Sequence, residues 1–201
     1  MATRLLTRSI ASIFAGLTLT ACHFLSETNL ITPEMRVNPF GSAGAYIVPD
    51  SDGGPSDEAL LRLPDGGFLA LKSGNATDLG DVLVRYDFAG ISEDQWPAQA
   101  DAPLPGTPYL ASMCEIRALD ATNGCWLLAA FVASDGRVYT MLPTAGENDP
   151  ETIAFTDPSA AIDALHTAWV DERYEMESHH PFIEMTDDLA TELDFNPPAF
   201  R

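Results

Sequence analysis

The sequence predicts an α+β fold: an antiparallel sheet of about five to seven strands, with one longer and one short C-terminal helix. Apolar and polar residues alternate through much of the chain, and glycine-containing turns separate the alternating segments. After residue 157 the apolar residues recur with the period of a helix instead. The hydrophobic fraction of 46% in 201 residues is typical of a globular protein rather than a disordered one.

The first predicted strands form a hairpin and a third strand. Residues 59–63 and 68–72 flank Pro64-Asp65-Gly66-Gly67, where glycine supplies the positive φ that tight hairpin turns need. Residues 82–88 alternate apolar with polar side chains, which is typical of a strand with one buried face. Four prolines between residues 93 and 108 then predict a long loop.

A second group of three strands is predicted over residues 113–119, 125–133 and 137–142. Asn123-Gly124 and Asp135-Gly136 mark the turns between them. Residues 125–133 are almost entirely apolar, so this strand is expected at the centre of the sheet. The two groups share no residue-level match, and no internal repeat is predicted.

Two helices are predicted near the C-terminus. Asp157 can cap the first, Pro158 suits its first position, and the helix should run to about Tyr174 against the sheet. Thr186 can cap a shorter helix through Leu193. The apolar face of the first helix consists of Ala161, Ile162, Leu165, Ala168 and Trp169.

The first 21 residues differ in kind from the rest. Arg4 and Arg8 give a basic start, and the apolar run over residues 10–19 is too short to span a bilayer, so this segment predicts an export signal. It ends in Leu19-Thr20-Ala21-Cys22, an aliphatic residue and two small residues before a cysteine. This motif resembles the lipobox of bacterial lipoproteins. An ordinary secretory signal with a chance cysteine is the alternative.

The resemblance covers only the first 22 residues, and it implies where in the cell the protein is located. In that family the cysteine thiol is alkylated with diacylglycerol, the signal is removed, and the new amino group is usually acylated. Cys22 would then anchor the protein by lipid in the cell envelope, because two or three acyl chains hold stably to a membrane. His23 stands where aspartate retains relatives at the inner membrane, which implies the outer membrane, facing the periplasm.

The chain is predicted to have three parts: a signal peptide over 1–21, a lipidated tether over 22–44, and a single globular domain over 45–201. The tether region is rich in Ser, Thr, Asn, Pro and Gly and shows little periodicity. Roughly 180 residues remain after Cys22, which is enough for one domain with a core.

The charge of the mature chain limits its partners. Without the signal peptide, eight basic residues face 30 acidic ones, for a formal net charge of −22. Such a surface repels phosphates, so no nucleic-acid partner is expected. It also repels anionic headgroups, so the acyl chains must anchor the protein. The expected partners are the membrane, through lipid on Cys22, and an envelope protein.

Cys114 and Cys125 are expected to form a disulfide, because the compartment outside the cytoplasm is oxidising. On the chain-entropy account such a bond stabilises by about 3 kcal/mol. If the turn centres on Thr122, the two cysteines are not directly opposite, and a wider loop or a bulge is needed. A thiol nucleophile is the alternative, but no Cys-x-x-Cys motif supports a redox role.

His179 and His180, with Glu175, Glu177 and His166 near in sequence, are the best candidate metal ligands. Their spacing matches no metal motif, and a solvated helix end followed by a loop is the favoured interpretation. We therefore expect no cofactor, with a divalent cation as the alternative.

The acidic segment 50–58 suggests a calcium loop at first glance. Leu61 stands where an EF-hand needs its twelfth-position glutamate, so an acidic turn between strands is the favoured interpretation.

The functional expectation is a non-enzymatic accessory or interaction module of the envelope. The sequence has no Gly-x-Ser-x-Gly elbow and no phosphate-binding glycine loop. Trp96 and Tyr109 flank the proline-rich loop and are the expected contact surface. A small-ligand or divalent-cation binding lipoprotein is the first alternative, and an envelope hydrolase is a more distant one.

Overall fold

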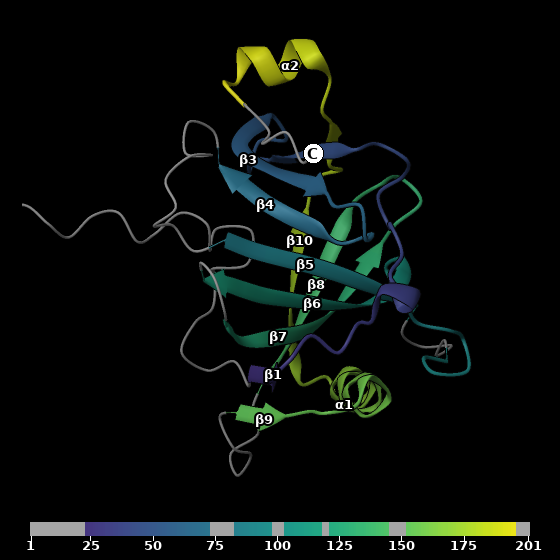
Figure 1. Cartoon of the computed structure of the whole chain (residues 1–201). Coiled ribbons are helices and arrows are strands. Elements are labelled where there is room, and N and C mark those ends of the chain that lie inside the picture. Colours follow the sequence, from purple (N-terminus) through teal and green to yellow (C-terminus); the bar gives the residue numbers. More distant parts are fainter. Residues whose placement is uncertain (1–22, 73–82, 98–102, 118–120, 145–151, 196–201) are drawn as a thin grey trace, which may run out of the picture.

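A computed structural model describes residues 23–72, 83–97, 103–117, 121–144 and 152–195, which form one large sheet with two helices (Figure 1). The elements are β1 (His23–Ser26), the 3-10 helix η2 (Pro33–Met35), β2 (Ala45–Pro49), β3 (Pro55–Arg62), β4 (Phe68–Lys72), β5 (Leu83–Gly90), β6 (Thr107–Arg117), β7 (Ala121–Val132), β8 (Val138–Pro143), β9 (Thr152–Ala154), α1 (Pro158–Val170), β10 (Tyr174–His179), β11 (Ile183–Glu184) and α2 (Asp187–Glu192).

The predicted α+β fold with five to seven strands is wrong: the described residues form an 11-stranded sheet. The sheet is mixed, because β1 pairs in parallel with β9 whereas the other pairs are antiparallel. The prediction missed short strands whose partners lie far away in sequence, since β1 pairs with β7 and β9, and β11 pairs with β2. It also missed β10, because the sequence of residues 174–179 predicts a solvated helix end followed by a loop.

The two helices begin where the cap residues predict, but α1 ends at Val170 and not near Tyr174, which is the first residue of β10. The side chain of Asp157 accepts a hydrogen bond from the amide of Ala160 at 3.0 Å, and Pro158 begins α1. Thr186 caps α2 in the same way, through the amide of Leu189 at 3.3 Å.

The sheet curls until its two ends nearly meet. Its order is β10-β8-β7-β6-β5-β4-β3-β2-β11, and the strands at its two ends are joined by residues 180–182 alone. Turns from both halves of the sheet contact this link. A Cβ at Gly53, between β2 and β3, would lie 3.2 Å from the His180 ring, and one at Gly136, between β7 and β8, would lie 3.2 Å from Pro181. The result is a nearly closed cylinder.

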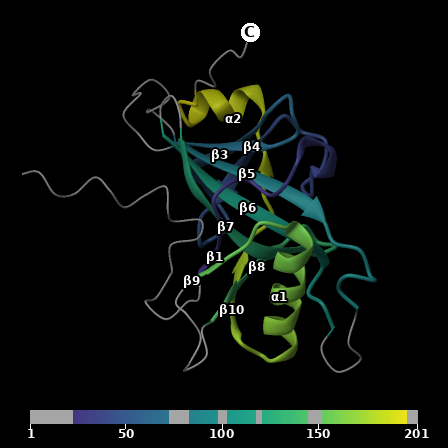
Figure 2. The same cartoon turned by 60° about the horizontal axis from the view of Figure 1, so that its bottom comes forward.

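The two faces of the sheet bury two separate clusters. One cluster joins β2 and β3 to β7 and β8, which are not neighbours, so these side chains meet across the inside of the cylinder. Its buried members are Tyr46, Val48, Leu60, Phe68, Ala70, Val84, Tyr86, Phe88, Ala111, Leu128, Ala130 and Leu142. The other cluster lies on the outer face, where α1 packs against β7 and β8 (Figure 2).

The segment expected as a tether packs on this outer face. Residues 23–37, which we call the strap, include β1 and η2, and they bury Phe24, Leu30 and Ile31. The amide of Val37 donates to the carbonyl of Phe88 at 2.9 Å. The structure thus places residues from His23 onward in the folded domain, because the few apolar side chains of the strap find partners on distant strands.

The predicted signal peptide and Cys22 lie outside the described residues. Within the part of the chain that the structure describes, neither helix is long and apolar enough to cross a bilayer.

Candidate functional site

The structure separates His166 from the candidate metal ligands on β10. Glu177 and His179 share one face of β10, and they pair with Thr140 and Val138 of β8. His166 lies on α1, whose apolar side packs on the opposite, outer face of the sheet. Among the described residues no group of three or more His, Cys, Asp or Glu side chains is placed to hold a metal ion.

Burial shifts the ionisation of both β10 residues. It lowers the pKa of His179, whose Nε2 lies 3.3 Å from the hydroxyl of Thr140. Burial raises the pKa of Glu177, and the neighbouring charge of Glu175 adds to the rise. Both shifts favour the uncharged side chains, as expected for groups taken out of water.

Trp96 and Tyr109 do not form a common surface. Trp96 is only 1% exposed, and its ring packs against those of Phe131 and His166, with centroids 5.6 and 5.4 Å away. It therefore belongs to the outer cluster. Tyr109 packs against the inner cluster from β6, and burial raises its pKa.

The disulfide between Cys114 and Cys125 is confirmed. The two residues are directly opposite on β6 and β7, with their Cα atoms 4.2 Å apart. A register shift between Cys114 and Ile116 supplies the bulge that the spacing requires. The predicted turn at Asn123-Gly124 is wrong, because both residues lie within β7.

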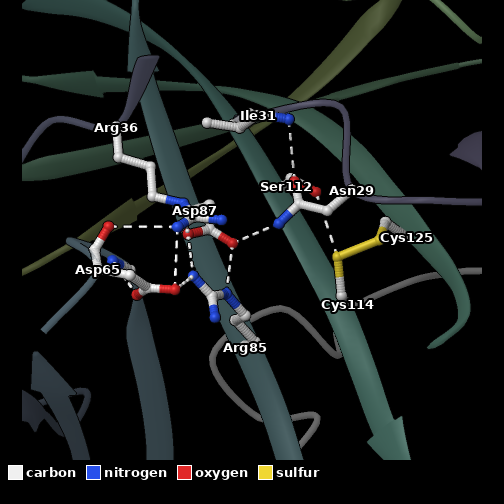
Figure 3. A network of polar contacts seen from close by, with 10 residues as sticks. Asn29, Ile31, Arg36, Asp65, Arg85, Asp87, Ser112, Cys114 and Cys125 are labelled. Atoms are coloured by element: carbon white, nitrogen blue, oxygen red, sulfur yellow. Dashed lines mark hydrogen bonds and ion pairs between the residues drawn. A yellow bond between two sulfur atoms is a disulfide. The ribbon is translucent and has the colours of Figure 1, made fainter. Parts of the chain in front are cut away.

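The most heavily buried charges gather beneath the strap, close to this disulfide (Figure 3). Asp87 of β5 is fully buried, with 0% exposure. Its Oδ1 lies 2.7 Å from Nε of Arg36 in the strap, and its Oδ2 lies 2.7 Å from Nε of Arg85. Nη2 of Arg85 donates to Oδ1 at 2.9 Å, and the side-chain amide of Asn29 also donates to Oδ2. Both oxygens of the carboxylate are thus bound by donors.

A second carboxylate completes the network. Asp65, in the turn between β3 and β4, lies 2.9 Å from Nη1 of Arg36 and 2.9 Å from Nη2 of Arg85. Burial alone would raise the pKa of Asp65, but the hydrogen bond from Arg85 and the other favourable contacts outweigh it and lower the pKa. The hydrogen bond to Asp87 raises the pKa of the Arg85 guanidinium further. Two cations and two anions therefore neutralise one another.

Gly67 leaves space for this network. A Cβ at that position would lie 2.4 Å from Oδ1 of Asp87 and 2.5 Å from Nη2 of Arg85. The hairpin prediction assigns a positive φ to both turn glycines. Of the two, only Gly66 has a positive φ, at 90°. Gly67 is needed for close approach instead.

This arrangement, which we call the clamp, joins three segments: the strap, the turn between β3 and β4, and β5. Asn29, Arg36, Asp65, Arg85 and Asp87 form it. The central carboxylate is buried and bound by donors on both oxygens, so its geometry suits holding the strap rather than proton transfer. Sequence reasoning missed the clamp because Asn29 and Arg36 fall in the expected tether, and Arg85 and Asp87 fall on the polar face of a predicted strand.

No protein-family model, curated protein or solved structure matches this chain.

Proposed function

We propose that this protein is a lipid-anchored lipoprotein of the cell envelope, which acts as a non-enzymatic accessory or interaction module. Lipid on Cys22 would hold it at the outer membrane, facing the periplasm. The lipobox and the signal that precedes it support the anchor. The acidic composition makes the acyl chains, rather than headgroup attraction, the source of membrane affinity.

One observation carries the proposal of a tethered module: the chain enters the sheet one residue after the lipidation position. His23 is already the first residue of β1, and the clamp fixes the rest of the strap to β5. A domain joined so closely to its anchor is held at the membrane in a restricted geometry. That suits a protein that works by being positioned beside a partner.

The test is capture of the lipidated protein after crosslinking in cells. We expect a stoichiometric envelope partner with the unchanged chain, and loss of that partner with Cys22→Ala, which removes the anchor and leaves the domain intact. The same partner captured equally by both chains would show that tethering is unnecessary. Capture of no partner above background would contradict the interaction role.

A small-ligand or divalent-cation binding lipoprotein is the second candidate. It is favoured by the polar groups on the inner face of the sheet, where Glu58 adds to the rise in the pKa of buried Tyr86, and where Glu177 and His179 also lie. A ligand that binds only the folded state raises the melting temperature, and the rise grows with the logarithm of the ligand concentration above its Kd. Thermal melts with calcium and with zinc test this candidate, and unchanged melting temperatures at millimolar metal would exclude those two ions.

A further inference from the structure

The start of β1 restricts how the domain can sit on a membrane. His23 pairs with Thr152 of β9, and Phe24 is only 6% exposed. Cys22 precedes His23 directly in the sequence, so an anchor at that position is joined to β1 without a spacer. If Cys22 carries lipid, its glycerol backbone lies at the headgroup level, and β1 and β9 must lie there too.

The strands β1 and β9 themselves are uncharged, although acidic residues flank both in the sequence: Glu27 after β1, and Glu151 and Asp157 around residues 152–156. From His23 to Ser26 and from Thr152 to Thr156, no side chain is acidic or basic apart from His23. Thr152, Ala154 and Thr156 are exposed along this edge. Of the two strands only β9 is an edge, because β1 pairs with both β7 and β9. Without charges of its own, β9 can lie against a surface.

The opposite side of the molecule is strongly acidic. Figure 1 and Figure 2 both place α2 far from β1 and β9, on the other side of the sheet. Residues 184–194 there contain five acidic side chains and no basic one: Glu184, Asp187, Asp188, Glu192 and Asp194. An acidic surface is repelled by the negative potential of anionic lipids. The position of the proposed anchor turns this acidic side away from the bilayer, although acidic residues also flank β1 and β9.

We propose that the edge formed by β1 and β9 lies against the bilayer surface, and that the acidic side carrying α2 faces away from it. The occupant of the edge is the headgroup layer of the membrane. This inference rests on the proposed lipidation of Cys22, and it adds that the strap is a short rigid connection rather than a flexible spacer. The surface available to an envelope partner is then the side of α2 and β3.

The test compares two labelled positions on the full lipidated chain. Thr152→Cys lies beside the anchor and Glu192→Cys lies on α2; both positions are exposed. The native cysteines are occupied, in the disulfide and by lipid, so each variant offers one thiol for the same fluorophore. In phosphatidylcholine vesicles with a quencher on the headgroups, we expect quenching several-fold stronger at position 152 than at position 192.

The same two labels in a chain with 15 Gly/Ser residues inserted between Cys22 and His23 provide the reference. Such a spacer reaches about 21 Å on average, so the domain can turn, and the ratio of quenching should approach one. A ratio in the directly joined chain that equals this reference would overturn the orientation. Mass measurement of each sample separates the two claims, because a chain without lipid contradicts the proposed function, whereas equal quenching on a lipidated chain contradicts only the orientation.

Discussion

At the scale of single residues, Asp87 is the central side chain of the clamp. It is completely buried and is bound by two guanidinium groups and an amide. Such a buried pair adds little compared with a well-packed apolar core, but removing one partner leaves the other charge buried without compensation. The clamp therefore makes the strap sensitive to single substitutions.

Asp87→Asn should destabilise the fold by about 3–5 kcal/mol, because Arg36 and Arg85 would keep their charges in a buried site. Urea unfolding of the Cys22→Ala chain measures the loss. The matched control is Asp135→Asn, which removes an exposed ion pair with Arg137 and keeps the turn chemistry, and which should cost less than about 1 kcal/mol. Similar losses in both variants would contradict the role of the clamp.

His179 predicts a pH dependence of stability. Burial lowers its pKa below the ordinary 6.5, so the unfolded chain takes up a proton at a higher pH than the folded chain. Its contribution to stability is complete above about pH 6.5 and is lost as the pH falls below that value. His179→Gln should flatten the fall in the free energy of unfolding below pH 6.5. A variant with the same pH profile as the unchanged chain would show that His179 does not contribute.

At the scale of elements, the hairpin of β6 and β7 is held by the disulfide as well as by its ladder. The sequence separation of Cys114 and Cys125 is 11 residues. Replacing both cysteines by alanine should cost about 2–3 kcal/mol, on the account that the bond restricts the unfolded chain. Unfolding with and without reductant measures this, and the double variant should be insensitive to reductant. An unchanged midpoint for the double variant would contradict the estimate of the bond's contribution.

Elements with local signals could be predicted from the sequence, and elements with distant partners could not. The glycine turn of residues 64–67 indicates the hairpin of β3 and β4, and Asp157 with Pro158 marks the start of α1. Short strands such as β1 and β9 have no such signal, because three or four residues show no usable period. The number of strands in the sheet, and with it the fold class, was therefore wrong.

At the scale of the whole molecule, the candidate site could not be predicted because it depends on how the sheet curls and on where the strap lies. Asn29 and Arg36 are far in sequence from Asp87, and only the packing of the strap brings them together. The residues that stood out in the sequence had other surroundings: Trp96 is in the outer cluster, and His166 lies on α1, away from His179. The disulfide was predictable, because the predicted export signal implies an oxidising compartment and the predicted lipid on Cys22 leaves two cysteines to pair.

The proposed anchor on Cys22, the edge at β1 and β9 and the acidic side of α2 together describe a domain with a proposed membrane side and a free side. This account depends first on lipid at Cys22. The most direct measurement is mass spectrometry of the N-terminal peptide of the protein purified from membranes, with Cys22→Ala as the control. We predict a peptide that begins at Cys22 and carries diacylglycerol and an amide-linked acyl chain. A mature chain that begins elsewhere, or that begins with an unmodified Cys22, would contradict the account.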